Sequence, residues 1–291
     1  MDISIITPIY NGNKYLRNYI EKINGACENK KDVEVIFVND SPLIELELDT
    51  KSIRNFKYKI IHNMKNEGIQ KSRINGLNEA IGKYIIFLDQ DDEITKEALV
   101  TQFEMAEKTN ADLIIGNGYF EDVNGLHLIY ENKFSQNFSK RKKPYVKARD
   151  FIVSPGQCLI KKDSIPEEWK KNILKQNGTD DFLLWLLMFN KKRKVCCNYN
   201  LVYIHKYTKE NLSSNLDKMY KSQIELLKIL KNIDNYDKKD YKILERTIEY
   251  KHVYKQNFIK ESIKNIDIFI YNIFYRSVWR GYVYKRQSYE K

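Results

Sequence analysis

The sequence predicts an α/β fold in which helices flank a mostly parallel sheet, followed by a C-terminal helical extension. Short apolar runs alternate with helical patterns about every fifteen residues over the first part of the chain, which is typical of a parallel sheet. Each apolar run ends in polar residues, as strands that enter loops do. After residue 214 the apolar spacing is helical throughout. We therefore expect two domains, residues 1–214 and residues 215–291.

The expected strands are short and apolar, and helical spacing of apolar residues appears between them. Strands are predicted at residues 3–11, 33–41, 58–63, 84–88 and 111–120, and helices at residues 15–23, 74–81 and 100–106. Ligands bind beyond the carboxyl ends of the strands in such sheets. Polar clusters follow three of these strands, at residues 7–11, 39–41 and 89–92, so we expect them to converge on one edge.

Beyond residue 120 the alternation fades. Residues 139–149 predict a basic loop, and residues 151–160 predict a strand that a Pro-Gly turn interrupts. Thr179 is expected to cap a following helix. Asp180 and Asp181 would then occupy its first turn, where the helix dipole favours negative charge.

The composition describes a basic globular protein. The formal net charge is +11 and the pI is about 9.2, which favours acidic partners such as nucleic acid, anionic lipid or phosphorylated substrates. The four cysteines form no C-x-x-C pair, so neither a zinc site nor a disulfide framework is predicted. The N-terminus lacks the features of a signal peptide, and no apolar run is long enough to span a membrane. We expect a cytoplasmic protein.

Three carboxylates follow the strand at residues 84–88, namely Asp89, Asp91 and Asp92. Like charges this close repel each other unless a cation or a hydrogen-bond network holds them. Carboxylate oxygens suit Mg²⁺ or Mn²⁺, which proteins usually bind through one or two carboxylates together with substrate phosphates. The alternative is that the three acids only decorate a solvated turn.

Five segments in order resemble the family 2 glycosyltransferases of the GT-A fold, of the bacterial polysaccharide and cell-surface glycan type. They are SIITPIYN, VIFVNDS, NEGIQKSRINGLNEAIGKYIIFLDQDD, GTDDF and YIHKYTKENLS, and together they extend from Ile3 to Ser213. Two positions depart from the family pattern. Asn39 stands where the family usually has the first Asp of Asp-Asp-Gly-Ser, and Ile74 replaces the usual Asn beside the signature arginine, Arg73.

The resemblance implies a role for each matching residue. The nucleotide would be bound by Thr7, Pro8, Tyr10, Asn11, Asp40, Arg73, Asp89, Gln90 and Asp91. A Mn²⁺ or Mg²⁺ ion would be held by Asp91, Asp92 and His205, and the diphosphate by Lys206, Asn211 and Ser213. Asp181 would be the catalytic base, with Asp180 as the close alternative. Both acids would instead be simple first-turn acids if the helix dipole alone explains them.

The implied activity is inverting transfer of a sugar, of the hexosyltransferase type, from a nucleotide-sugar to a hydroxyl of a glycan or lipid-linked glycan. A UDP-hexose or UDP-N-acetylhexosamine is the first expectation for the donor, and a dTDP-sugar the second. Residues 120–175 would form the acceptor side and match no motif. The alternatives are a nucleotidyltransferase, a non-catalytic nucleotide-binding relative, and a scaffold that binds membranes or polyanions. The nucleotidyltransferase would need a Gly-rich phosphate loop, and TPIYNGNKY offers one Gly.

The C-terminal region is basic and aromatic. Residues 215–291 hold 17 Lys and Arg against 10 Asp and Glu, a net charge of +7. The aromatic, cationic stretch at residues 266–286 fits an interfacial segment on an anionic membrane, here the inner face of the plasma membrane. It equally fits a helix that packs on the catalytic domain or on a second copy in a homodimer. Nucleic acid ranks last, because no nucleic-acid module is recognisable.

Overall fold

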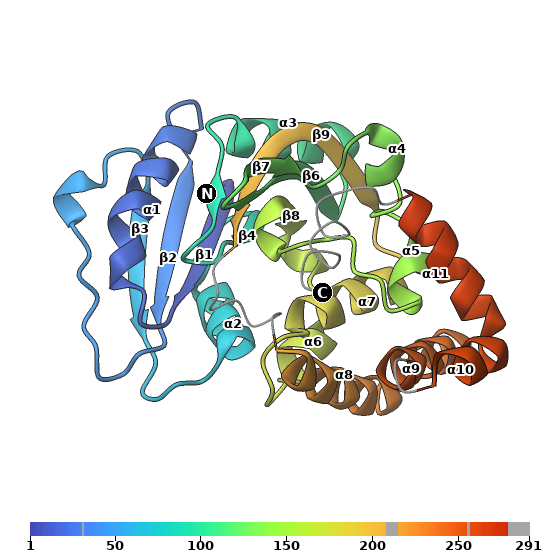
Figure 1. The fold of residues 1–291 in the computed structure, drawn as a ribbon. Helices are drawn as coiled ribbons and strands as arrows, with labels where there is room; N and C mark the ends of the chain where they lie inside the picture. Colours follow the sequence, from blue (N-terminus) through green and yellow to red (C-terminus); the bar gives the residue numbers. More distant parts are fainter. Residues whose placement is uncertain (31, 208–214, 255–256, 279–291) are drawn as a thin grey trace.

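The computed structural model describes residues 1–30, 32–207, 215–254 and 257–278 (Figure 1). A single curled sheet runs through the first two thirds of this chain. The strands are β1 (Ile3–Ile9), β2 (Val33–Asn39), β3 (Lys57–His62), β4 (Tyr84–Phe87), β5 (Glu93–Ile94), β6 (Leu113–Asp122), β7 (Gly125–Leu128), β8 (Cys158–Lys161) and β9 (Val195–Lys206). Their order is β3-β2-β1-β4-β8-β6-β9-β5, and β7 pairs with β6.

The first four strands form the parallel half of the sheet, as predicted. β1 pairs in parallel with both β2 and β4, and β2 pairs in parallel with β3. Every residue of β2 and β4 is buried, which explains why these strands read as continuous apolar runs rather than alternating ones. Helices α1 (Asn13–Ala26), α2 (Ile69–Glu79) and α3 (Ala98–Thr109) follow β1, β3 and β5. Gly76 of α2 lies against β1, because a Cβ atom there would come within 2.4 Å of Ile6.

The second half of the sheet is mixed. β8 pairs antiparallel with both β4 and β6, so the strand predicted at residues 111–120 exists but is not a direct neighbour of the parallel set. Only Cys158–Lys161 of the predicted strand at residues 151–160 is a strand, because Pro155–Gln157 forms a 3₁₀ turn before it. Two short helices, α4 (Lys133–Gln136) and α6 (Glu167–Lys171), also lie in this half.

The prediction of a loop at residues 139–149 was wrong in part, since Lys142–Val146 forms helix α5. The segment is rich in charged residues, but two of its side chains, those of Tyr145 and Val146, are buried. The ring of Tyr145 packs against Phe189 at 4.7 Å and Phe182 at 6.4 Å between ring centroids. Both phenylalanines belong to α7 (Asp180–Asn190), so α5 is fixed beside the helix that begins with the two predicted catalytic acids.

The described part of residues 215–291 is helical, as predicted. It comprises α8 (Leu216–Lys231), α9 (Lys238–Val253), α10 (Phe258–Lys264) and α11 (Ile266–Val278). Leu226, Leu230, Leu244 and Ile248 are buried in the same hydrophobic core as the sheet. The division into two domains therefore remains a prediction, because α8 and α9 share the core of the preceding residues. None of the helices within the described ranges is long and apolar enough to cross a membrane.

Candidate active site

The polar ends of β1, β2 and β4 meet at one edge of the sheet, as the sequence predicts. The Gln90 side chain spans the gap from β4 to β1: its Oε1 accepts from the Tyr10 backbone N–H at 3.0 Å, and its Nε2 donates to the Tyr10 carbonyl at 3.1 Å. The Asn11 N–H donates to Ser41 Oγ at 2.8 Å and so ties β1 to β2. Asn11 has a φ of 50°, in the left-handed region that asparagine tolerates better than most residues. The Tyr10 ring is left exposed above this edge.

Asp40 is buried beneath the same edge and holds the loop before α2. Its carboxylate accepts from the N–H groups of Glu67 at 2.8 Å and Gly68 at 3.0 Å, and from Asn63 Nδ2 at 2.8 Å. Gly68 has a φ of 83°, which favours glycine at this turn. The structure thus shows Asp40 as a loop anchor, and its predicted contact with the nucleotide base stays a prediction.

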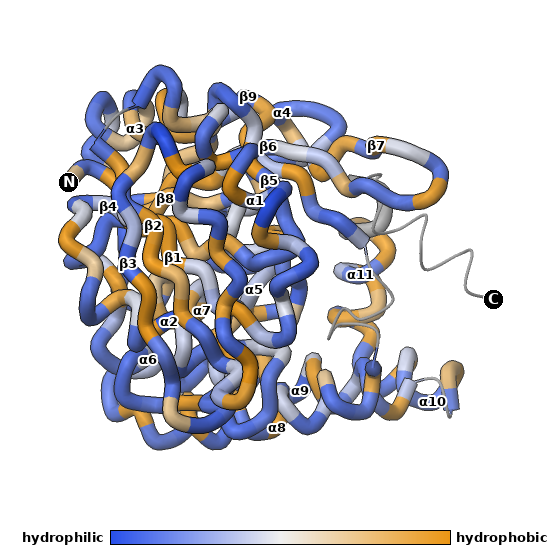
Figure 2. Tube along the Cα trace, turned by 90° about the vertical axis from the view of Figure 1, so that its left-hand side faces the viewer, coloured by the Kyte–Doolittle hydropathy of each residue, from blue (hydrophilic) through white to orange (hydrophobic). Residues whose placement is uncertain are grey.

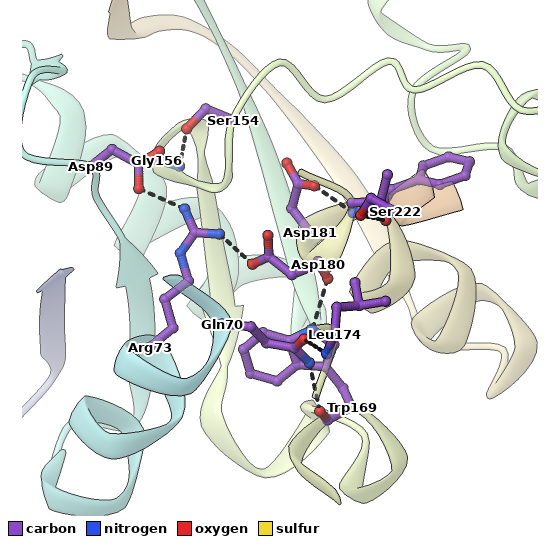
Figure 3. A network of polar contacts seen from close by, with 12 residues as sticks. Gln70, Arg73, Asp89, Ser154, Gly156, Trp169, Leu174, Asp180, Asp181 and Ser222 are labelled. Atoms are coloured by element: carbon purple, nitrogen blue, oxygen red, sulfur yellow. Dashed lines mark hydrogen bonds and ion pairs between the residues drawn. The ribbon is translucent and has the colours of Figure 1, made fainter. Parts of the chain in front are cut away.

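Arg73 joins the strand-end acids to the start of α7 (Figure 3). Its side chain is only 3% exposed, and it donates to Asp89 Oδ1 at 2.6 Å and to Asp180 Oδ2 at 2.7 Å. Burial would lower the pKa of Arg73, but these carboxylates raise it above its usual value, so the guanidinium stays charged. Its buried position supports a bridging role, while its predicted contact with the nucleotide remains untested.

Asp181 stands apart from this bridge. In Figure 3 its carboxylate is turned away from Arg73, whereas that of Asp180 points toward it. Asp181 Oδ1 accepts from the N–H of Phe182 at 2.7 Å. Burial, and then the charge of Asp180, raise the pKa of Asp181 to about 7. A carboxyl group with this pKa can both accept and release a proton near neutral pH.

Asp92 is the most enclosed of the three strand-end acids and is bound to the end of β9. It accepts from the Tyr203 hydroxyl, from the Lys206 N–H at 3.1 Å, and pairs with His205 Nδ1 at 3.0 Å. Burial alone would lower the pKa of His205, but Asp92 and its neighbours Asp89 and Asp91 raise it. Of the predicted metal ligands, the structure therefore pairs Asp92 with His205, while Asp91 is near enough for its charge to help raise the pKa of His205.

Asp91 is the strand-end acid without a balancing cation. Arg73 pairs with Asp89 and His205 with Asp92, whereas none of the ion pairs in the described part of the chain includes Asp91. Burial and the charges of Asp92 and Asp89 raise its pKa to about 7. An uncompensated carboxylate fits a divalent cation that takes its other oxygens from a ligand. Within the described ranges no group of three or more His, Cys, Asp or Glu side chains is arranged to hold a metal ion.

Comparisons with known proteins identify the family of this chain. Residues 4–169 match the model of the family described as glycosyl transferase family 2. The match covers more than half of the chain, including β1, β2, β4 and the strand-end acids.

This chain is a family 2 glycosyltransferase.

Its relatives are bacterial. It is 26% identical over 221 residues to glycosyltransferase GlyA of Streptococcus pneumoniae, a match that covers 72% of this chain but only 31% of the length of GlyA. It is 27% identical over 264 residues to the GalNAc(5)-diNAcBac-PP-undecaprenol β-1,3-glucosyltransferase of Campylobacter jejuni, which covers 82% of this chain and 78% of that protein.

Among solved structures, residues 1–349 of S. aureus TarS in complex with UDP-GlcNAc superimpose with a TM-score of 0.66 at 17% identity. The match covers 87% of this chain and 73% of TarS 1–349. This likeness shows the fold, so the predicted GT-A fold is confirmed.

Some predicted site residues of this glycosyltransferase have other partners, and some lie outside the described ranges. The buried Thr7 hydroxyl bonds to Tyr19, and Pro8 is part of β1. The Lys206 ammonium pairs with Glu93, the residue after Asp92. Asn211 and Ser213, predicted to bind the diphosphate, fall within residues 208–214, outside the described residues.

The sequence analysis missed several residues that position the acids. Tyr203 lies two residues before His205, and both side chains bond to Asp92. Residues two apart on a strand point to the same face, but this relation becomes apparent only once β9 is known to be a strand. Trp169 donates its indole N–H to the Asp180 carbonyl at 2.8 Å, and Gln70 holds the Trp169 carbonyl at 3.0 Å (Figure 3). Neither residue carries a motif that marks this role.

Asp150 is a further acid that the sequence analysis did not single out. It follows α5, and part of the residue is exposed to solvent. Protein atoms nevertheless surround its carboxyl group, and this burial raises the pKa of Asp150 well above the ordinary value. The charge of Asp181 adds to this rise, so the two carboxylates are electrostatic neighbours. The Ile152 N–H donates to Asp150 Oδ1 at 2.9 Å and fixes the side chain on its loop.

Proposed function

We propose that this enzyme transfers a sugar from a UDP-sugar to an acceptor hydroxyl with inversion, and that Asp181 is the catalytic base. One observation carries the proposal. Of the adjacent acids at the start of α7, Asp180 is committed to Arg73, whereas Asp181 is turned away from it and has a pKa of about 7. The two acids that the sequence leaves as alternatives thus have different environments, and that of Asp181 suits proton transfer.

In this mechanism Asp181 accepts the proton of the acceptor hydroxyl while the hydroxyl oxygen attacks the anomeric carbon. The bond from that carbon to the diphosphate oxygen breaks on the opposite face, which inverts the configuration. Arg73 pairs with the Asp180 carboxylate, while burial and the charge of Asp180 keep the pKa of Asp181 raised. The same arginine connects Asp89 to Asp180, the residue before the proposed base, and so would help to fix the spacing of the acceptor and donor sides.

A UDP-sugar is the donor that the fold neighbour and the exposed Tyr10 ring favour. The fold neighbour TarS is known in complex with UDP-GlcNAc, and the exposed Tyr10 ring lies beside the strand-end acids where a base could stack on it. UDP-N-acetylglucosamine is therefore the first donor to test. A dTDP-sugar remains the second candidate.

We propose that a divalent cation, Mn²⁺ or Mg²⁺, assists this transfer. Asp91 would hold it, with Asp92 and His205 beside it, and the bound cation would neutralise charge on the leaving diphosphate. Asp92 contributes chiefly by fixing the end of β9, since its oxygens are bonded to Tyr203, Lys206 and His205. The raised pKa of Asp91 supports this assignment, because the added positive charge would relieve its repulsion from Asp89 and Asp92.

The acceptor that we propose is a glycan or a lipid-linked glycan. The name of the Campylobacter relative specifies an undecaprenol-linked acceptor, and that relative aligns with most of this chain. An acceptor of this kind would require the enzyme to work at the cytoplasmic face of a membrane. A homodimer through the C-terminal helices is the other arrangement that their sequence allows.

Calorimetric titration tests the donor proposal. UDP, dTDP, GDP and ADP are added to the protein with Mn²⁺ and again with EDTA. We expect UDP to bind in the presence of Mn²⁺ and to lose at least about tenfold in affinity with EDTA, because the diphosphate would lose its counter-charge. A preference for dTDP would change the sugar donor, and no binding of any nucleotide would contradict the proposed function.

An Asp91→Asn variant tests the metal proposal. The substitution keeps the size of the side chain and removes the charge, so UDP binding should lose its dependence on Mn²⁺ while the fold stays intact. Asp163→Asn, at an exposed position in the turn after β8, is the matched control and should bind UDP as the parent does. Unchanged metal dependence in Asp91→Asn would contradict the assignment.

A further inference from the structure

The outer side of α10 and α11 carries a row of exposed apolar residues. Seven large apolar side chains within seventeen residues are between 52% and 72% exposed: Phe258, Ile259, Ile263, Ile266, Ile270, Ile273 and Phe274. We call these seven residues the apolar stripe. Figure 2 shows hydrophobic colour along both helices, at the side of the molecule away from the sheet. Exposed apolar residues elsewhere in the described ranges, such as Val123 or Leu43 beside Ile44, form no row of this length and need no explanation. A contiguous exposed apolar surface marks an interaction site.

The inner side of α11 is already occupied. Ile268 is buried, and the Asn272 amide oxygen accepts two hydrogen bonds from the Arg149 guanidinium at 2.8 and 3.2 Å. The Lys147 ammonium lies 4.7 Å from the centroid of the Tyr271 ring. The orientation of the helix is therefore fixed by polar and cation–π contacts, and the apolar stripe is the side that these contacts leave outward.

The charges around the apolar stripe decide between the partners. Lys260 and Lys264 follow Ile259 and Ile263 directly in the helix, are exposed, and form no ion pair with a described residue. The acid of α11, Asp267, is neutralised by Arg246 and lies 3.9 Å from Lys147. Glu261 lies between these two lysines on α10, so the helix keeps a net charge of +1 beside the stripe, within a region whose formal charge is +7.

A second copy of this chain suits such a surface poorly. A two-fold interface brings the same patch of each copy together, so Lys260 and Lys264 would face their own counterparts and two regions of +7 would meet. An anionic bilayer accepts both features, because apolar side chains enter the boundary of the acyl chains while lysines contact the headgroups. With thirteen residues α11 is about 20 Å long, shorter than a bilayer core of about 30 Å, so it would lie on the surface.

We propose that the apolar stripe is a docking face for an anionic lipid bilayer. This inference rests on the proposed function, and it names the surface that would bring the enzyme to a lipid-linked acceptor. The inner side of α11 holds Arg149, the residue before Asp150, and Asp150 is the electrostatic neighbour of the base Asp181. Docking through the outer side therefore places one helix between the lipid surface and the acceptor side of the site.

Vesicle co-sedimentation of the full chain tests the docking face. The probes are vesicles of phosphatidylcholine alone and vesicles with about 30 mol% phosphatidylglycerol. We expect binding to the anionic vesicles only. Ile263→Glu combined with Ile270→Glu should weaken it at least about tenfold, because each glutamate replaces buried apolar surface with a repelled charge. Lys260→Glu combined with Lys264→Glu should abolish the preference for anionic lipid. Val123→Glu combined with Leu43→Glu is the matched control and should bind as the parent does.

Two further measurements separate this inference from the proposed function. Hydrolysis of UDP-N-acetylglucosamine in buffer needs no lipid, so Ile263→Glu with Ile270→Glu should leave its rate unchanged. If the parent protein binds no nucleotide, the proposed function fails whatever the vesicles show. If the parent binds UDP but binds no anionic vesicle, or if the stripe variants bind vesicles as the parent does, the docking face is refuted. A parent dimer that these variants convert to monomers, with vesicle binding unchanged, would assign the stripe to self-association instead.

Discussion

The proposed donor side and the proposed acceptor side of this enzyme are built in different ways. On the donor side, the hydrogen bonds come from side chains of the strand-end segments themselves. Gln90 joins the end of β4 to that of β1, Ser41 joins β2 to β1, and Asp40 holds the loop before α2. On the acceptor side, the loop that carries Asp150 is held from a distance. The Lys251 ammonium of α9 bonds to the Ala148 carbonyl, and Asn272 of α11 bonds to Arg149, both more than a hundred residues along the chain.

The two proposed sides therefore depend on different parts of the fold. The proposed donor side is tied to the sheet, in which every residue of β2 and β4 is buried. The acceptor side depends on helices that follow the sheet, and these can change without disturbing the strands. α8 also supports the base from this side, because Ser222 bonds to the Thr179 hydroxyl at 2.7 Å and Glu225 accepts from the N–H groups of Lys175 and Gln176.

The strongest test of this comparison is Asp181→Asn, which removes the proposed base at the point where the two sides meet. We expect sugar transfer to fall by roughly 10² to 10⁴-fold, the usual contribution of a positioned base. UDP affinity should stay within about twofold, because the donor side is untouched. Steady-state transfer and calorimetric binding are measured on the same preparation. Full transfer by this variant would show that Asp181 is not the base.

Arg73→Met breaks the connection between the two sides. The substitution leaves Asp89 and Asp180 without their cation, and removing one member of a buried ion pair usually costs about 3–5 kcal/mol. We expect about 3 kcal/mol of lost unfolding free energy, since Asp89 is 26% exposed and water can relieve part of its charge.

Chemical denaturation measures this loss, and Arg73→Lys is the informative comparison. Lysine keeps the charge but cannot donate two separate hydrogen bonds in the fork geometry of a guanidinium. It should recover part of the stability and little of the activity. A stability equal to that of the parent in Arg73→Met would mean that the bridge contributes nothing to the fold.

The donor side was predictable from the sequence for a physical reason. A buried parallel strand must be a continuous apolar run, and its polar end must lie at the ligand edge, so residues 84–92 show both features at once. The sequence could not show which partner each of the three strand-end acids, Asp89, Asp91 and Asp92, would have. That division depends on Arg73, Tyr203 and His205, which reach the acids from α2 and β9.

The acceptor side was largely invisible in the sequence. The stretch that contains α5 looks like a basic loop, because residues 139–149 place four lysines and two arginines around the two residues that anchor it, Tyr145 and Val146. Thr179 was expected to cap α7 with its hydroxyl, but that hydroxyl bonds to Ser222 of α8 instead. Contacts between distant segments have no local signature, and so tertiary packing overrides the local expectation.

A pH series sharpens the comparison at Asp181 itself. Its pKa is raised to about 7, so the folded protein binds a proton there more tightly than the unfolded chain does. Ionisation of Asp181 therefore reduces stability as the pH rises from about 4 to about 7. Asp181→Asn removes this penalty. We expect it to be about 1–2 kcal/mol more stable than the parent at pH 8 and equally stable at pH 4, after allowance for solvent at this half-buried side chain.

Thermal unfolding at both pH values checks this prediction, with Asp234→Asn, an exposed acid between α8 and α9, as the control. Transfer by the parent should increase through pH 7 as Asp181 ionises. If the difference in stability between the parent and Asp181→Asn is the same at pH 4 and at pH 8, Asp181 is not held in its protonated form.

The smallest expected effect lies at the far end of the acceptor side, in Asn272→Ala. The change removes the acceptor of both Arg149 hydrogen bonds but no buried apolar group, so the fold should lose about 1 kcal/mol or less. The loop of Asp150 would keep its bond from Lys251 of α9. We expect the KM for the acceptor to rise about three- to fivefold with UDP affinity unchanged, because the bond that is lost lies on the proposed acceptor side. Asn232→Ala, at the exposed end of α8, is the control. A matching loss of UDP affinity in Asn272→Ala would mean that the two sides are not independent, and that α11 supports the whole site.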